Sequence, residues 1–198
     1  LDIDLGSFPY VTSSHPGLNG FSIATGVDPR TVTRVIGVTK AYATRVGSGP
    51  MPTELTGKIG DQLRTAGHEF GTTTGRPRRC GWLDIPAIRY GSRVGGVTSL
   101  ALTKLDILDS FDEIQVCSAY TYKDKTYTTL PTADPIFMEK LKPVYKTIPG
   151  WKKETSSTRS FDALPKQAQV YVKRIEKLAG IPIEIVSVGP EREATFFR

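Results

Sequence analysis

Threonine and arginine residues are concentrated between residues 71 and 79, where the chain reads GTTTGRPRR. The threonines offer hydroxyl and backbone N–H donors, and the two flanking glycines let the backbone approach a ligand closely. Arg76 and Arg78 alternate, so in an extended loop they point the same way and Arg79 points away. A guanidinium binds carboxylate or phosphate with two hydrogen bonds, so the loop suits a small dianion. The alternatives are a basic solvent loop and a nucleic-acid contact, but no aromatic residues interleave with these arginines.

A second segment that is able to bind a ligand follows the apolar residues 99–102 and consists of Thr103, Lys104, Leu105 and Asp106. Ligands of α/β sheets bind at the carboxyl ends of strands, and TKxD at such a place resembles the base-recognition motif of GTP-binding proteins. A carboxylate accepts hydrogen bonds from the ring N–H and the amine of guanine, whereas adenine presents an acceptor in place of that N–H. The stem of Lys104 can lie against the purine. The alternative is a surface turn with a Lys104–Asp106 pair.

A third segment, Ser187, Val188 and Gly189, follows another apolar run at 181–186. A small polar residue followed by glycine at a strand end can supply N–H groups to the guanine carbonyl. The alternative is a plain exit from a strand into a turn. Guanine binding becomes plausible when this segment is combined with residues 103–106, because neither is specific alone.

The pattern of the remaining chain predicts the elements that position these segments. Asp28 and Pro29 are typical of a helix start, and Asp84 is a second N-cap, whereas Gly180 is a natural end for the last helix. Residues 17–26 and 45–53 are expected to be loops. Helices are expected at 28–39, 57–66, 84–95 and 166–179, and strands at 97–102, 114–119, 126–130, 143–147 and 181–186. Alternating helices and strands predict an α/β fold with a mostly parallel sheet, flanking helices and short inserted antiparallel strands.

Composition narrows the class of protein. The 198 residues contain 38% hydrophobic and 23% charged residues, which is typical of a soluble globular domain. The net charge of +6 indicates either a soluble surface with a basic excess or an anionic partner, which is a nucleic acid or a phosphorylated small molecule. No apolar run approaches the roughly 20 residues of a membrane helix, and no signal peptide is recognisable. Two cysteines and two histidines without metal-ligand spacing argue against a zinc site and fit a reducing compartment. We therefore expect no membrane and no nucleic-acid partner.

Several blocks of the sequence closely resemble adenylosuccinate synthetase, and together they cover essentially the whole chain. They are YVTSS, KAYATRVGSGPMPTEL, TTTGRPRRCGWLD, VTSLALTKLDILD and YVKRIEKLAGIPIEIVSVGPERE, at 10–14, 40–55, 72–84, 97–109 and 171–193. The resemblance implies a ligase of purine nucleotide biosynthesis, cytoplasmic and homodimeric. Such an enzyme joins IMP to L-aspartate with GTP as co-substrate and Mg²⁺ as metal. It phosphorylates the 6-oxygen of IMP, and the aspartate amine then displaces that phosphate.

The resemblance also implies roles for individual residues. Arg76 is implied to be shared by aspartate and IMP, and Arg78 to reach the GTP side as well. The implied aspartate-binding residues are Thr72, Thr73, Thr74, Gly75, Arg76, Pro77 and Arg78; the implied IMP-binding residues are Thr12, Val46 and Arg76; the implied GTP-binding residues are Arg78, Lys104, Leu105, Asp106, Ser187, Val188 and Gly189.

One departure from the family pattern limits what the chain is expected to do. The phosphate loop GDEGKGK is not present in residues 1–198, nor are the catalytic Asp and His, since His15 and His68 do not match that His. The whole chain is therefore expected to be the C-terminal portion of one synthetase domain, a P-loop-GTPase-like half that lacks the phosphate loop. We expect no catalytic residue and no metal ligand in it, and no activity alone. The alternatives are a guanine-nucleotide-binding module without catalysis and an RNA-contacting domain.

Overall fold

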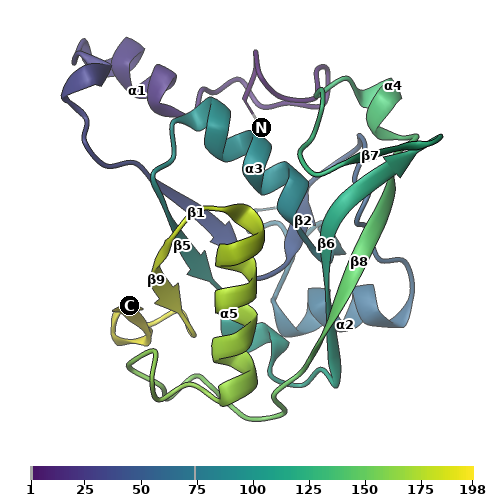
Figure 1. Ribbon diagram of the computed structural model, residues 1–198, viewed down its shortest axis with the longest axis vertical. Helices are drawn as coiled ribbons and strands as arrows, with labels where there is room; N and C mark the ends of the chain where they lie inside the picture. The colour runs from purple at the N-terminus through teal and green to yellow at the C-terminus, as the bar shows by residue number, and fades with distance from the viewer. Residues whose placement is uncertain (1, 74) are drawn as a thin grey trace.

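Helix α5 (Lys166–Ala179) packs where two β-sheets meet in the computed structural model, which describes residues 2–73 and 75–198 (Figure 1). The first sheet has the strand order β1–β5–β9–β10. Strands β1 (Ile36–Lys40), β5 (Ser99–Thr103) and β9 (Ile183–Ser187) run parallel, and the short β10 (Thr195–Phe197) runs antiparallel to β9. The predicted mostly parallel sheet is thus confirmed.

The second sheet is built on the long strand β6 (Glu113–Tyr122). Strand β4 (Leu83–Asp84) pairs with it in parallel, and β7 (Lys125–Tyr127) and β8 (Lys142–Pro149) pair antiparallel. These are the short antiparallel strands that the sequence predicts after residue 113. A separate ribbon is formed by the antiparallel strands β2 (Ala43–Arg45) and β3 (Arg79–Gly81).

Capping residues mark the ends of the main helices. The helices besides α5 are α1 (Leu18–Thr25), α2 (Lys58–Ala66), α3 (Ile85–Gly95), α4 (Pro135–Met138) and the 3₁₀ turns η1 (Pro29–Thr31), η2 (Leu105–Leu108) and η3 (Arg192–Ala194). At the start of α3 the Asp84 carboxylate accepts from the Ala87 N–H at 3.0 Å, as an N-cap does. Gly96 and Gly180 end α3 and α5 in the left-handed region, at φ 67° and 73°. None of the helices in the described residues is both long and apolar enough to cross a bilayer.

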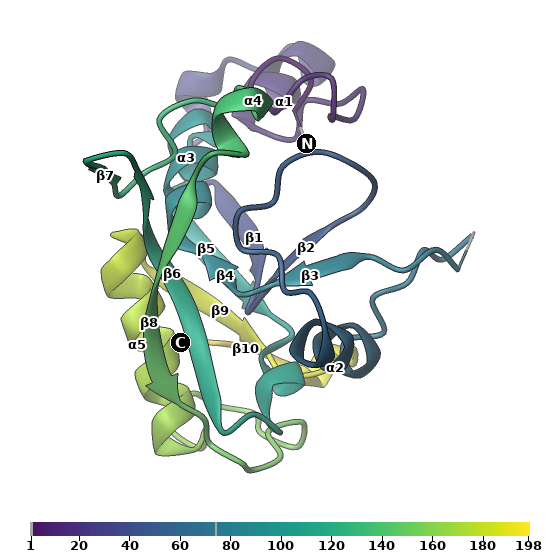
Figure 2. The ribbon, with the colours of Figure 1, turned by 90° about the vertical axis from the view of Figure 1, so that its right-hand side faces the viewer.

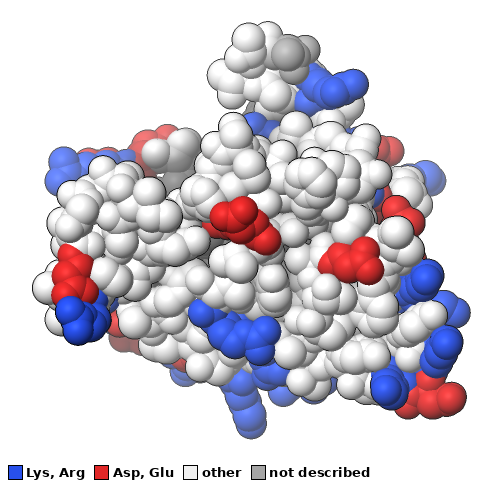
Figure 3. Space-filling model, turned by 90° about the horizontal axis from the view of Figure 1, so that it is seen from above, with Lys and Arg blue, Asp and Glu red and all other residues white. Residues whose placement is uncertain are grey.

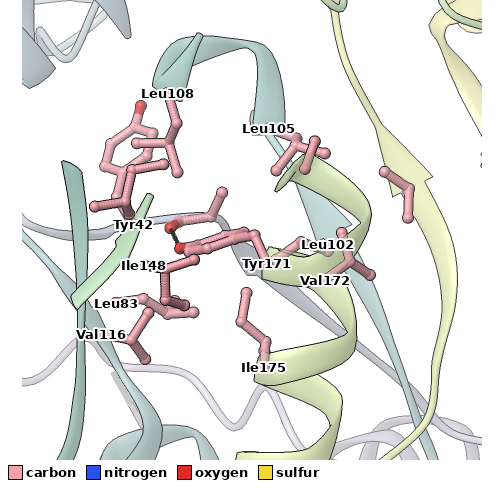
Figure 4. Close-up of a cluster of buried hydrophobic side chains, with 14 of the residues drawn as sticks. Tyr42, Leu83, Leu102, Leu105, Leu108, Val116, Ile148, Tyr171, Val172 and Ile175 are labelled. Carbon is pink, nitrogen blue, oxygen red and sulfur yellow. Dashed lines mark hydrogen bonds between the residues drawn. The ribbon is translucent and has the colours of Figure 1, made fainter. Parts of the chain in front are cut away.

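The main core lies between α5 and the two sheets. Tyr171, Val172 and Ile175 of α5 are fully buried among side chains of β5, β6 and β8 (Figure 4). Burying one such aliphatic side chain stabilises the fold by about 1.5–3 kcal/mol. The Tyr171 hydroxyl donates to the Ala41 carbonyl at 2.6 Å, which fixes α5 against the chain just beyond β1.

The helix predicted over residues 28–39 is wrong. Asp28 does cap a turn, accepting from the Arg30 N–H at 3.0 Å, but only the 3₁₀ turn η1 follows and Val32 is already extended. The next residues are mostly β-branched, which restricts side-chain rotation in a helix and suits a strand. Pairing with β5 is therefore more favourable than a helix for residues 36–40, which form β1. The predicted loop at 17–26 is also wrong, since it contains α1, a helix with no buried residue.

Candidate functional site

The two predicted guanine segments lie at one edge of the first sheet. Strands β5 and β9 are neighbours and parallel, with Leu102 opposite Val186, so their carboxyl ends meet at the same edge. Residues 104–106 leave the first strand there and residues 187–189 leave the second. The structure thus brings together segments that are far apart in the sequence, as a binding site for one planar ligand requires.

Lys104 turns the chain sharply at the end of β5. Its backbone is left-handed, with φ of 59°, and the turn η2 begins directly after it with a fully buried Leu105. Asp106 is half-buried, and this burial raises the pKa of its carboxyl; the charge of Glu191 acts in the same direction, whereas Lys104 opposes it. A ligand with two N–H donors would stabilise the Asp106 carboxylate in this place.

The segment after β9 is held by its own hydrogen bonds. The Val188 N–H donates to the Ala194 carbonyl at 2.9 Å, and the Ser187 hydroxyl donates to the Gly189 carbonyl at 3.0 Å. Val188 is fully buried. Its N–H is therefore engaged by the protein itself, which leaves the Gly189 N–H as the expected donor to a base.

The predicted aspartate loop forms a hairpin that projects from the body of the molecule (Figure 2). The Arg78 N–H donates to the Glu69 carbonyl at 2.9 Å, and Phe70 and Pro77 pair as an antiparallel bridge. Thr72, Thr73, Gly75, Arg76 and Pro77 are exposed, whereas Arg78 is only partly exposed. Thr74, which the resemblance also assigns to this site, lies outside the described residues.

Arg79 contacts a different set of residues from Arg78, which agrees with the expected alternation of their side chains. Its Nε and Nη2 donate to the Glu54 carboxylate, and its Nη1 donates to the Gly49 carbonyl at 2.7 Å and to the Gly47 carbonyl at 3.3 Å. Arg79 thereby fastens the loop that contains Val46, because this loop begins immediately after β2, the partner of β3.

The two predicted IMP residues outside the hairpin are exposed and lie on segments joined by Arg45. Its Nη2 donates to the Ser7 hydroxyl at 3.1 Å and to the Tyr10 carbonyl at 3.0 Å, close before Thr12. Its Nη1 donates to the Pro50 carbonyl at 3.0 Å, on the far side of the Val46 loop. Thr12 and Val46 are thus presented by two loops that one guanidinium ties together.

Glu69 is a candidate functional residue that no motif or spacing in the sequence indicates. It is fully buried, and its carboxylate accepts hydrogen bonds from Tyr42 at 2.6 Å, from Lys40 and Arg78 at 2.7 Å and from Lys104 at 3.0 Å. Burial alone would raise the pKa of Glu69, but these hydrogen bonds outweigh it and hold the pKa at about 2. Lys104 therefore pairs with Glu69 and also donates to the Gly67 carbonyl at 2.6 Å, rather than forming the simple surface pair with Asp106.

One group of side chains in residues 2–73 and 75–198 brings three ionisable ligand atoms close enough to share a metal ion. It comprises Asp2, Asp4 and His15, whose ligand atoms lie within 4.8 Å of one another. Mg²⁺ requires near-octahedral oxygen coordination, so a set that includes an imidazole does not fit it.

Charges are dispersed on the face of the molecule seen from above. Lys and Arg groups there alternate with Asp and Glu groups and with wide uncharged areas (Figure 3). A nucleic-acid surface needs a continuous basic stripe, which this face does not have.

Comparison with known proteins gives one consistent result. The family model of adenylosuccinate synthetase matches residues 1–196. The adenylosuccinate synthetase of Geotalea uraniireducens is 53% identical over 195 residues, covering 98% of this chain and 45% of the relative, and that of Heliobacterium modesticaldum is 50% identical over 198 residues. The fully ligated adenylosuccinate synthetase of Plasmodium falciparum superposes with a TM-score of 0.95 at 41% identity, covering 100% of this chain and 47% of the other. The chain spans about half the length of the curated relatives it matches.

Proposed function

The chain belongs to the adenylosuccinate synthetase family, and we propose that it is the C-terminal part of such a ligase, which joins IMP to L-aspartate at the expense of GTP. In this proposal the chain supplies the guanine contacts, the aspartate loop and part of the IMP site. The observation that carries it is the meeting of residues 104–106 and 187–189 at one edge of the sheet.

Each ligand is assigned to residues by the chemistry that they offer. The Asp106 carboxylate accepts from the two N–H donors of guanine, and Ser187 and Gly189 contact its carbonyl. Leu105 and Val188 are fully buried and anchor these two segments to the core instead of facing the base. The hairpin residues Thr72 to Arg78 bind the aspartate carboxylates. Thr12, Val46 and Arg76 contact IMP.

The rest of the active site is assigned to residues outside this chain. The phosphate loop, the catalytic Asp and His and the ligands of Mg²⁺ are proposed to come from the other part of the synthetase. Support comes from the sequence of residues 1–198, which does not contain the GDEGKGK loop. Magnesium, when bound, neutralises charge on the transferred phosphate. The intact enzyme is proposed to be a cytoplasmic homodimer that binds neither nucleic acid nor membrane.

The proposal is tested by assaying the purified 198-residue chain beside the full-length synthetase. The full-length protein is expected to form adenylosuccinate from IMP, GTP and aspartate. The chain alone is expected to form none above background, because general-base and metal contributions are each worth roughly a hundredfold or more. Turnover by the mass-verified chain at a rate near that of the full-length enzyme contradicts the division of the site, and no turnover by the full-length protein contradicts the function.

A further inference from the structure

We propose that Glu69 is a positioning residue that couples the guanine segment to the aspartate hairpin. The inference rests on the function proposed above. Each oxygen of the buried carboxylate serves a different side: Oε2 accepts from Arg78 of the hairpin at 2.7 Å, and Oε1 accepts from Lys104 of the guanine segment at 3.0 Å. Glu69 itself lies at the base of the hairpin, since its carbonyl accepts from the Arg78 N–H.

The balance of charge makes Glu69 essential to this arrangement. Three cations, Lys40, Arg78 and Lys104, converge on one carboxylate that is fully buried, while their own side chains are only about a third exposed. Without the negative charge these cations repel one another at short range in a medium of low dielectric constant. Arg78 and Lys104 would then turn towards solvent, away from the directions that Glu69 imposes.

The surrounding contacts keep the carboxylate itself in place. The Tyr42 hydroxyl donates to Oε1 at 2.6 Å and is buried, and the Lys40 ammonium bridges the same oxygen and the Thr44 hydroxyl at 2.9 Å. Tyr42 and Lys40 come from the end of β1 and the residues beyond it, beside β5. The first sheet is thus linked through Glu69 to the base of the hairpin, so that movement of Arg78 alters the environment of Lys104.

The test uses Glu69→Gln in the full-length synthetase, with KM measured separately for GTP, aspartate and IMP. Glutamine keeps the shape and one acceptor but removes the charge. Removing one partner of a buried ion pair is costly, so KM for both GTP and aspartate is expected to rise about tenfold or more, with KM for IMP changed least. The matched control is Glu176→Gln on α5, which removes the charge from the pair that Glu176 forms with Arg198 at 2.8 Å and is expected to leave the three KM values within about twofold.

A double-mutant cycle separates coupling from simple loss of stability. Lys104→Met and Arg78→Leu are made singly and together in a protein with Glu69 intact. Because both residues belong to one ion-pair network, the effect of the double variant on KM for GTP is expected to differ about threefold or more from the product of the two single effects. The same cycle in Glu69→Gln is expected to be closer to additive. If the glutamine variant does not fold, Glu69→Asp replaces it, because the shorter side chain keeps the charge but does not reach both Arg78 and Lys104. Additive effects with Glu69 intact, or a Glu69→Gln variant whose KM values match the Glu176→Gln control, overturn the inference. A wild-type synthetase that uses neither GTP nor aspartate overturns the proposed function instead.

Discussion

Arg78 and Lys104 donate to opposite oxygens of the Glu69 carboxylate, at 2.7 and 3.0 Å. One arginine of the projecting hairpin is thereby directed inward to the end of β5, whereas Arg76 remains exposed on the hairpin. The two arginines are thus placed differently, and this difference predicts different effects of their substitution.

Arg76→Leu in the full-length enzyme is expected to impair the use of aspartate and to leave GTP binding nearly intact. Loss of a bidentate charged pair should raise KM for aspartate about 30-fold, or about 2 kcal/mol. Arg78→Leu is expected to affect GTP as well as aspartate. Steady-state kinetics with each substrate varied in turn measure both effects.

The control for these substitutions is Arg159→Leu. Arg159 is exposed and donates to the nearby carbonyls of Ser156 and Thr158, so its substitution tests loss of charge alone. Equal, small effects of all three substitutions would mean that the hairpin is only a basic surface loop and that the assigned aspartate site is wrong.

Arg79→Leu is expected to raise KM for IMP more than KM for aspartate. Arg79 holds the carbonyls of Gly47 and Gly49 and the carboxylate of Glu54, so its loss frees the loop that presents Val46. Leaving these groups partly unpaired should also lower the free energy of unfolding by about 1–3 kcal/mol. Kinetics with varied IMP measure the change in KM, and urea denaturation measures the change in the free energy of unfolding. An unchanged KM for IMP would exclude the loop from the IMP site.

The free energy of unfolding is expected to depend on pH through the buried carboxyl of Asp84. Burial raises the pKa of its carboxyl to about 6, although hydrogen bonds from Tyr120 and the Ala87 N–H partly oppose the shift. The folded pKa lies above the unfolded value of 3.8, so the folded state binds the proton more tightly. The contribution of Asp84 is therefore fully present below pH 3.8 and is lost as pH rises through about 6.

The check is urea denaturation of wild type and Asp84→Asn between pH 4 and pH 7. Asparagine keeps the cap on α3 without a titrating charge. The stability of the wild type relative to the variant is expected to fall across this window by up to about 3 kcal/mol, since one pKa unit corresponds to about 1.4 kcal/mol. A difference that stays constant, or that grows with pH, contradicts this.

The sequence predicted those elements whose signals are local. Asp84, Gly96 and Gly180 mark the ends of α3 and α5 by capping chemistry that depends only on neighbouring residues. The local pattern predicts a helix where β1 forms, because the strand depends on pairing with β5, more than fifty residues away. Pairing partners at such a distance leave no periodic signal in either segment.

The same distinction applies to the candidate site. The meeting of residues 104–106 and 187–189 was predictable because both segments follow apolar strands, and the parallel pairing of β5 and β9 brings their ends together. Glu69 was not predictable, because Lys40, Tyr42 and Lys104 reach it from other elements and only the fold joins them. The contacts of Arg79 were not predictable for a related reason, since alternation in an extended loop does not reveal the carbonyls that the fold places beside it.

The measurement that tests the central claim most directly is the nucleotide preference of Asp106→Asn in the full-length synthetase. Guanine presents two N–H donors to Asp106, whereas xanthine presents one N–H donor and one carbonyl acceptor, which match the acceptor and donor of an asparagine amide. Kinetics with GTP, ITP and XTP are compared for wild type and variant. We predict that kcat/KM for GTP falls about tenfold or more, as a mismatched buried polar pair costs about 1–3 kcal/mol, and that XTP becomes the better substrate. An unchanged preference for GTP would show that Asp106 does not contact the base and would contradict the account.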